Sequence, residues 1–226
     1  MADYVIIVAG GAGTRMGTEV PKQFLSLHGK PVLLRTIETF YKYSASVKII
    51  LGLPQQHIPL WERLCEEQGH AGAEIIVPGG KTRFQTVKSC LQQINETSGC
   101  VAIHDGVRPM VSTKTINRTF EIARLGKGAV PVVSVKESIR KKTVAEKTAS
   151  VNRDDYMIVQ TPQTFPISDI QKAYSLDERP DMTDDATVFE RAGHEIVTVE
   201  GDINNIKITT PADLHFAEYL LGPINP

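Results

Sequence analysis

The sequence predicts an α/β fold in which a mostly parallel β-sheet carries helices on both faces. Short apolar runs of strand length alternate with amphipathic segments of helical period through the first 135 residues. This alternation is typical of βαβ units, because parallel neighbouring strands need a crossover that a helix supplies. The chain has 226 residues, 41% hydrophobic and 23% charged, so it can bury a core without metal or disulfides. We therefore expect a single domain over residues 1–226.

Five apolar runs are predicted as strands. They are Tyr4 to Ala9, Val47 to Leu53, Glu74 to Val77, Cys100 to His104 and Gly128 to Val133. Ligands of open α/β sheets bind outside the carboxyl ends of the strands. The functional residues are therefore expected where these runs end.

Helical spacing of apolar residues predicts the helices between the strands. The spaced residues are Leu33, Leu34, Ile37, Phe40 and Tyr41, then Phe84, Val87, Leu91 and Ile94, then Ile116, Phe120 and Ala123. The helices that these patterns predict would cover the sheet.

The pattern breaks at residues 136–156. Ser138 to Arg153 is polar, alternates weakly and has too few large apolar residues to form a core of its own. We expect a β-hairpin arm, and because an isolated hairpin is marginally stable, a homodimer in which the arm meets a partner. A surface loop is the alternative.

Further elements are predicted beyond the arm. They are a strand over Met157 to Gln160, a helix over Asp184 to Ala192, and short strands over Ile196 to Val199 and Ile206 to Ile208. A last helix should begin with Thr210 as its N-cap, Pro211 at the first helical position and Asp213 two residues further. Its inner face is expected to carry Leu214, Ala217 and Leu221.

Charge and composition narrow the classes of function. The net charge of −1 provides no protein-wide basic field for nucleic acid or anionic lipid, so any anion site must be local. No apolar run approaches the ~20 residues of a membrane helix and the first residues lack signal-peptide features, so we expect a cytoplasmic protein. Cys65, Cys90 and Cys100 are expected to be reduced core thiols.

A glycine-rich segment directly follows the first predicted strand. Ala9 to Gly17 reads AGGAGTRMG, and Pro21-Lys22-Gln23 comes shortly after it. Glycine lets backbone N–H groups approach phosphate oxygens closely, whereas the alternative is a tight turn. Arg15 and Lys22 add two cations, a combination that favours a triphosphate site.

Two familiar phosphate loops do not fit this chain. A dinucleotide fingerprint beginning at Gly11 would need glycine where Met16 stands. A Walker loop ending in Gly80-Lys81-Thr82 would need glycine where Ile75 stands. The spacing therefore disfavours an oxidoreductase and a P-loop enzyme.

Two further clusters follow predicted strands. In His104-Asp105-Gly106-Val107-Arg108-Pro109, Asp105 could hold Mg²⁺, or it could cap a turn and pair with Arg108. In Gly79 to Thr86, glycines precede a helix N-terminus, which suits either an anion or ordinary capping.

Taken in order, these motifs resemble the 2-C-methyl-D-erythritol 4-phosphate cytidylyltransferase family. The resemblance spans about Tyr4 to Leu221 and includes Thr161-Pro162-Gln163 and Asn205 to Thr209. It implies a Rossmann-like nucleotidyltransferase fold, a homodimer through an exchanged hairpin arm, CTP with Mg²⁺, and the non-mevalonate isoprenoid pathway. Ribitol-5-phosphate cytidylyltransferase shares most of the motifs and is the alternative, followed by a sugar-1-phosphate nucleotidyltransferase and a non-catalytic nucleotide-binding module.

The resemblance also implies roles for individual residues. Contacts with CTP fall to Ala9, Gly10, Gly11, Gly13, Gly80, Arg83, Thr86 and Gly106. Catalytic roles fall to Arg15, Lys22, Asp105, Arg153 and Lys207, with Asp105 as the metal ligand. The sugar phosphate would be held by Arg108, Arg153, Thr161, Thr183 and Lys207, of which Arg153 and Thr183 would come from the partner.

Three departures from the family pattern bear on these roles. Many members have two alanines where Gly106 and Val107 stand, and often an acid where Asn204 stands, which leaves a second metal-binding carboxylate open. The pair Gly10-Gly11 and Val107 resemble the ribitol relative.

No Ser/His/Asp or Cys/His arrangement is evident, which agrees with a phosphate nucleophile that is already ionised at neutral pH.

Overall fold

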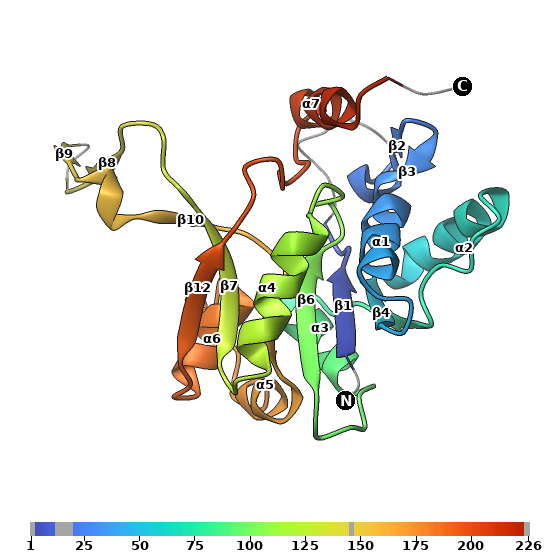
Figure 1. Ribbon diagram of the computed structural model, residues 1–226, viewed down its shortest axis with the longest axis horizontal. Helices are drawn as coiled ribbons and strands as arrows, with labels where there is room; N and C mark the ends of the chain where they lie inside the picture. The colour runs from blue at the N-terminus through green and yellow to red at the C-terminus, as the bar shows by residue number, and fades with distance from the viewer. Residues whose placement is uncertain (1–2, 12–19, 145–146, 224–226) are drawn as a thin grey trace.

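A single mixed β-sheet forms the centre of the protein. The structure, a computed structural model, describes residues 3–11, 20–144 and 147–223 (Figure 1). The strand order is β10-β7-β11-β6-β1-β4-β5, with β12 also paired to β7. The strands are β1 (Asp3–Val8), β4 (Lys48–Leu53), β5 (Ile75–Pro78), β6 (Cys100–Asp105), β7 (Gly128–Ser134), β10 (Met157–Val159), β11 (Gln163–Pro166) and β12 (Ile196–Glu200).

The core of this sheet is parallel, as the sequence predicts. Strand β1 runs parallel to β4 and β6, β4 parallel to β5, and β7 parallel to β12. Strand β11, which was not predicted, lies antiparallel between β6 and β7. Val8 at the end of β1 stands in register with Asp105 at the end of β6, so the glycine segment begins beside the second motif.

Helices cover both faces of the sheet, as predicted. One face packs against α1 (Val32–Tyr43), α2 (Ile58–Glu67) and α4 (Thr113–Ala123), and the other against α3 (Arg83–Leu91), α5 (Ile167–Ala173) and α6 (Asp185–Arg191). Alternate residues of β1 face opposite sides, because strand side chains have a period of two. Val5 and Ile7 join the first core, and Tyr4 and Ile6 join the second. The α2 helix and the α5 helix were not predicted.

A third, small core closes the carboxyl end of the sheet, at the top of Figure 1. It lies between α7 (Pro211–Leu221), the hairpin of β2 (Ser26–Leu27) and β3 (Lys30–Pro31), and the loop before α7. The buried residues of this core are Leu27, Val32, Val107, Ile208 and Ala217. The 3-10 helices η2 (Lys22–Phe24) and η3 (Gln55–His57) lie in the connections that follow β1 and β4.

The predicted position of α7 is correct, but the predictions for Leu221 and for the segment before the helix are wrong. Thr210 and Asp213 form the predicted capping box. Leu221 is 37% exposed, so its placement on the inner face was wrong, because the helix ends where the body no longer covers it. The strand predicted over Ile206 to Ile208 was also wrong: this segment is a loop whose Ile208 N–H donates to Val107 O.

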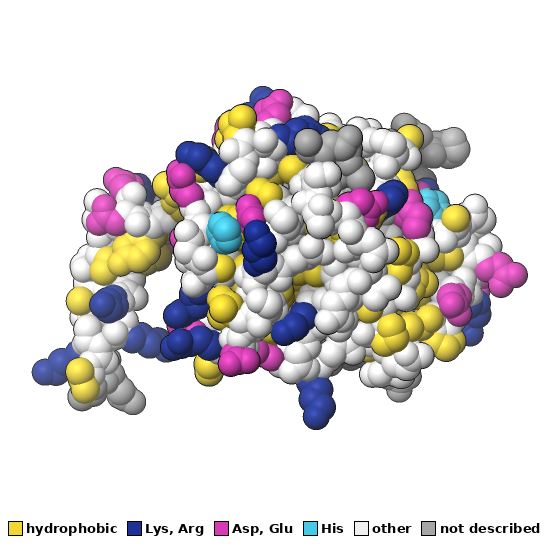
Figure 2. Space-filling model, turned by 90° about the horizontal axis from the view of Figure 1, so that it is seen from below, with side chains coloured by type: hydrophobic (Ala, Val, Ile, Leu, Met, Phe, Trp, Pro, Cys, Tyr) yellow, Lys and Arg dark blue, Asp and Glu magenta, His cyan; other side chains and the backbone are white. Residues whose placement is uncertain are grey.

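The arm is a short antiparallel hairpin that extends away from the body. It consists of β8 (Arg140–Lys142) and β9 (Thr148–Ser150) and is followed by η4 (Arg153–Asp155). All six strand residues are exposed. Figure 2 shows the arm standing apart from the body, and on this face basic and acidic side chains are interspersed. The predicted hairpin is thus present.

Cys65, Cys90 and Cys100 are free and buried, as predicted. No helix within the described ranges is long and apolar enough to cross a bilayer.

Candidate active site

A cavity of about 340 Å³ lies at the carboxyl ends of β1, β5 and β6. The glycine segment, the Gly79 to Thr86 segment and Asp105 meet in its wall, as the strand-end rule predicts. Its lining includes Ala9, Gly10, Gly11, Lys22, Gly80, Arg83, Thr86, Asp105 and Lys207. The site therefore joins all three clusters that the sequence singled out.

A second cavity of about 330 Å³ adjoins the first. Arg83, Asp105 and Lys207 line both cavities. The remaining lining of the second cavity includes Arg108, Thr161, Thr183, Gln163 and Asp184. Two anionic molecules placed in the two cavities would thus meet at the same three charged side chains.

Asp105 is buried and paired with two cations. Its Oδ2 lies 3.0 Å from Arg108 Nε and 3.1 Å from Lys207 Nζ. Burial would raise the pKa of Asp105, but Lys207, Arg83 and Arg108 outweigh it and hold the pKa below its ordinary value. Asp105 is therefore a carboxylate at neutral pH.

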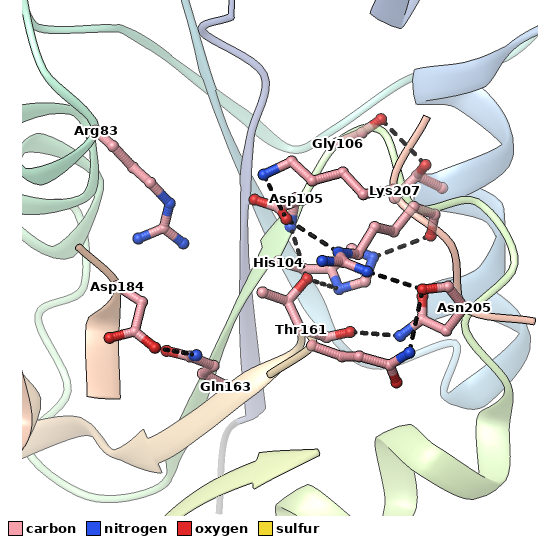
Figure 3. Close-up of polar contacts among 12 residues, drawn as sticks. Arg83, His104, Asp105, Gly106, Thr161, Gln163, Asp184, Asn205 and Lys207 are labelled. Atoms are coloured by element: carbon pink, nitrogen blue, oxygen red, sulfur yellow. Dashed lines mark hydrogen bonds and ion pairs between the residues drawn. The ribbon is translucent and has the colours of Figure 1, made fainter. Parts of the chain in front are cut away.

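A hydrogen-bonded chain fixes the groups around Asp105 (Figure 3). The backbone N–H of Asp105 donates to Thr161 Oγ1, which lies 3.0 Å from His104 Nδ1. His104 Nε2 lies 3.1 Å from the carbonyl of Arg108. Burial lowers the pKa of His104 to about 4, so the ring is neutral near pH 7. A carbonyl can only accept, so Nε2 carries the proton and Nδ1 accepts from Thr161.

Asn205 ties the Lys207 loop to this chain. Its side-chain amide donates to Thr161 O over 2.8 Å, and its backbone carbonyl accepts from Arg108 Nη1 over 2.8 Å. Asn205 is fully buried. The loop thereby holds Lys207 over Asp105.

Arg83, which is partly exposed, forms an ion pair with the buried Asp185 on the opposite wall. Its Nη1 and Nη2 each lie 2.6 Å from an oxygen of Asp185, and Tyr174 Oη lies 2.6 Å from the same carboxylate. Burial would lower the pKa of Arg83, but the charge and hydrogen bonds of Asp185 raise it above its ordinary value. Burial and Asp185 also raise the pKa of Tyr174, so the phenol is a hydrogen-bond donor.

The Gly79 to Thr86 segment is shaped by its own hydrogen bonds. Thr82 caps α3 by accepting from the Gln85 N–H, and Thr86 Oγ1 accepts from the Gly80 N–H. A Cβ on Gly80 would lie 2.4 Å from Gln85 Cβ, so only glycine fits without a shift. Thr86 therefore shapes the loop as well as lining the cavity.

The structure brings most of the predicted site residues together. Arg15 and Gly13 lie outside the described residues. Gly106, expected to contact CTP, lines neither cavity, and its N–H donates to Val8 O. Arg153 lies on the arm and donates to Lys136 O, and Thr183, expected from a partner, lines the cavity of its own chain.

Sequence reasoning assigned no site role to Gln163, which was named only within a motif, or to Asp184 and Asp185. Gln163 Nε2 donates to Asp184 Oδ2 over 2.8 Å, and Asp185 holds Arg83. The available signal was the acidic pair directly after Thr183, which was interpreted only as the start of a helix.

The donor set fits a magnesium ion that is shared with nucleotide phosphates. Among the residues that the structure describes, no group of three His, Cys, Asp or Glu side chains could hold a metal by itself. Mg²⁺ is usually bound by one or two carboxylates together with substrate phosphates and water. Both cation contacts of Asp105 fall on Oδ2, and a carboxylate has about four acceptor sites, so capacity for a metal remains.

The chain is similar to known proteins over nearly its whole length. The family model described as 2-C-methyl-D-erythritol 4-phosphate cytidylyltransferase matches residues 4–223. A protein of that name from Bacteroides fragilis is 47% identical over 221 residues, covering 98% of this chain and all of the relative.

Solved structures agree in fold. The 4-diphosphocytidyl-2C-methyl-D-erythritol synthase of Anaerococcus prevotii superposes with a TM-score of 0.82 at 27% identity, covering 98% of this chain and 99% of the other. The 2-C-methyl-D-erythritol 4-phosphate cytidylyltransferase of Thermus thermophilus gives a TM-score of 0.77 at 28% identity, covering 97% and 98%. The predicted Rossmann-like nucleotidyltransferase fold is thus confirmed. The chain belongs to the 2-C-methyl-D-erythritol 4-phosphate cytidylyltransferase family.

Proposed function

We propose that the protein transfers CMP from CTP to 2-C-methyl-D-erythritol 4-phosphate and releases pyrophosphate, as a step of non-mevalonate isoprenoid synthesis. Family membership over residues 4–223 supports the reaction. The structural observation that carries it is the sharing of Arg83, Asp105 and Lys207 by two adjoining cavities. Bringing two anions together requires fixed charges at the place where they meet.

In this proposal the nucleotide occupies the first cavity. The N–H groups of Ala9, Gly10 and Gly11 and the side chain of Lys22 would contact its phosphates. Gly13 and Arg15, which lie outside the described residues, are proposed to add a further N–H group and a second cation. Gln23 Nε2 donates to Ala9 O over 3.0 Å and so fixes the start of the glycine segment. Gly80, Arg83 and Thr86 border the cytidine side of the cavity.

The acceptor phosphate occupies the second cavity, beside Arg108, Thr161, Thr183 and Lys207. One of its oxygens attacks the α-phosphorus of CTP, a new P–O bond forms, and the bond to the β-phosphate breaks. The bonding electrons leave with pyrophosphate. Because the attacking phosphate is already ionised, no general base is needed, and charge stabilisation supplies the catalysis.

Asp105 is the proposed ligand of Mg²⁺. When bound, the ion would neutralise charge on the nucleotide phosphates. Lys207, Arg83 and Arg108 keep Asp105 ionised, which is the form that can bind a cation.

We further propose a homodimer in which the 136–156 arm meets a partner and brings Arg153 to the partner's site. Strand β10 supports this, because Met157, Ile158 and Val159 are 59%, 48% and 44% exposed beside the arm. Exposed apolar residues in a row are typical of an interface. We also propose a cytoplasmic location, which three free cysteines support.

Pyrophosphate release tests the reaction. The protein should release pyrophosphate from CTP and Mg²⁺ with 2-C-methyl-D-erythritol 4-phosphate, and much less with ATP, GTP or UTP. Ribitol 5-phosphate is assayed in parallel, because Gly10-Gly11 and Val107 resemble the ribitol relative. Faster turnover with ribitol 5-phosphate would replace the proposed acceptor, and CTP binding without pyrophosphate release would indicate a binding module.

A further inference from the structure

Asp185 is a fully buried carboxylate that lines neither of the two cavities, yet it holds a side chain that lines both. Both of its oxygens accept from Arg83, each over 2.6 Å. Tyr174 Oη donates to Oδ1 over 2.6 Å. Asp185 thus makes three short hydrogen bonds, and two of them go to one guanidinium.

The pairing determines which way Arg83 points. An arginine side chain has several rotatable bonds, but two parallel hydrogen bonds to one carboxylate fix the plane of its guanidinium. Because Arg83 lines both cavities, the oriented guanidinium lies in the wall that they share. Two of the five N–H donors bond to Asp185, which leaves three that do not bond to this carboxylate.

Hydrogen bonds also link Asp185, which holds Arg83, to the wall of the second cavity. Asp185 is the first residue of α6, and Asp184 caps that helix by accepting from the Thr187 N–H. Gln163 binds the same helix start, since its Nε2 donates to Asp184 Oδ2 and its Oε1 accepts from the Ala186 N–H, each over 2.8 Å. Gln163 stands two residues after Thr161, so the wall of the second cavity and the anchor of Arg83 form one connected unit.

We propose that Asp185, supported by Tyr174, is a positioning residue that orients the Arg83 guanidinium at the junction of the nucleotide and acceptor cavities. The proposal deepens the function proposed above and rests on it. The paired carboxylate offsets part of the positive charge of Arg83, so Arg83 acts as an oriented set of donors more than as a free cation. Removing the carboxylate would leave a side chain that samples several directions and an uncompensated cation in a partly buried site.

The test is a double-mutant cycle on kcat/KM for CTP, with CTP affinity measured separately by calorimetry. Asp185→Asn should lower kcat/KM by about 10- to 100-fold, the size of effect seen when a partner behind a metal ligand is removed. Asp185→Glu, which keeps the carboxylate, should recover part of the loss. In an Arg83→Met background, Asp185→Asn should cause little further loss, because both changes remove the same oriented group.

The matched control is Asp3→Asn. Asp3 also pairs with an arginine, Arg124, but at the amino end of β1, away from both cavities. This variant should keep kcat/KM within about two-fold of wild type. Thermal unfolding of every variant separates loss of positioning from loss of folded protein.

Tyr174→Phe keeps the proposal testable if Asp185→Asn does not fold. This variant removes one hydrogen bond to Asp185 and should lower kcat/KM by about two- to ten-fold with a folded protein. The proposal would be overturned if Asp185→Asn kept the kcat/KM of wild type, or if the losses in the double-mutant cycle were independent. If Asp185→Asn is unfolded, a Tyr174→Phe variant with the kcat/KM of wild type would overturn it. If wild type releases no pyrophosphate with either acceptor, the proposed function fails, and the CTP affinities of the same variants then decide the role of Asp185.

Discussion

Lys207 Nζ lies 3.1 Å from Asp105 Oδ2, the same oxygen that accepts from Arg108 Nε. The loop that carries Lys207 reaches this position because Asn205 bonds to Thr161 and Arg108, and because Ile208 N–H donates to Val107 O. Two cations therefore share one carboxylate at the end of β6. Because these two side chains are already ordered, the binding of an anion loses less conformational entropy than it would with mobile side chains.

Lys22→Ala should lower turnover far more than stability. Lys22 is only partly buried and lines the nucleotide cavity, so its loss removes charge where phosphates are expected. Removing one such electrostatic group typically lowers kcat by about 10²–10³. Pyrophosphate release and thermal unfolding are measured together, with Lys42→Ala on the exposed surface of α1 as the control. Unchanged turnover in Lys22→Ala would remove this residue from the mechanism.

Thr161→Val should weaken both the fold and acceptor binding. Its hydroxyl accepts from Asp105 N–H and lies 3.0 Å from His104 Nδ1, so valine leaves two buried polar groups without their partner. Such a loss costs about 1–3 kcal/mol. Urea unfolding measures the stability, and KM for the acceptor phosphate reports on the cavity. Thr161→Ser keeps the hydroxyl and should remain close to wild type, and equal losses in the two variants would contradict this account.

Gly80→Ala should disturb the nucleotide loop, whereas Gly10→Ala should leave the fold intact. A Cβ on Gly80 would lie 2.4 Å from Gln85 Cβ and 3.3 Å from the Gln85 carbonyl carbon, so the loop must move. A Cβ on Gly10 would meet nothing within 4 Å. Thermal unfolding should therefore show a lower Tm only for Gly80→Ala, accompanied by weaker CTP binding. A Gly80→Ala protein with the Tm and CTP affinity of wild type would show that the loop adapts without cost.

The capping box of α7 should make part of the stability depend on pH. Burial opposes ionisation of Asp213, but hydrogen bonds from Thr209 and Thr210 lower the pKa of its carboxyl below the ordinary value of 3.8. A group whose pKa is lower in the folded state stabilises the fold above its unfolded pKa, and this contribution is lost as pH falls through the folded pKa. Asp213→Ala should thus lower the free energy of unfolding by about 0.3–1 kcal/mol at pH 7.

The difference in the free energy of unfolding between wild type and Asp213→Ala should shrink as pH falls below about 4. In this region the carboxyl of the unfolded chain takes up its proton. Urea unfolding of both proteins at pH 7, 5 and 3.5 measures it. If the difference in the free energy of unfolding stays constant across this pH range, the Thr210 hydroxyl and packing contacts stabilise the helix start, and the charge of Asp213 does not.

Ile158→Lys should convert a dimer to a monomer. Ile158 is 48% exposed on β10, beside the arm, and a charge there would be costly to bury against a partner. Light scattering after gel filtration measures the mass. Leu125→Lys, at another exposed apolar residue, is the control and should leave the mass unchanged. A wild-type protein that is already monomeric would exclude the proposed dimer.

Much of the fold follows from local patterns that the sequence itself contains. The continuous apolar run Tyr4 to Ala9 supplies side chains to both cores, because successive side chains of a strand point to opposite faces of the sheet. The Thr210 and Asp213 capping box involves neighbouring residues only, and it was predicted correctly. The clustering of glycines, Lys22, Arg83 and Asp105 at strand ends could likewise be predicted, because the carboxyl ends of parallel strands meet at one edge of the sheet.

Contacts between distant segments were decided only by the tertiary structure. The insertion of β11 between β6 and β7 places Thr161 beside His104, and no local pattern encodes that pairing. The segment over Ile206 to Ile208 has the composition of a strand but becomes a loop, because its N–H groups donate to Asn204 O and Val107 O and not to a neighbouring strand. The Arg83 to Asp185 pair arises in the same way, since its strength depends on burial and on two aligned hydrogen bonds. Sequence thus determined which chemical groups the protein has at its strand ends, and the packing of remote segments determined how those groups are oriented and charged.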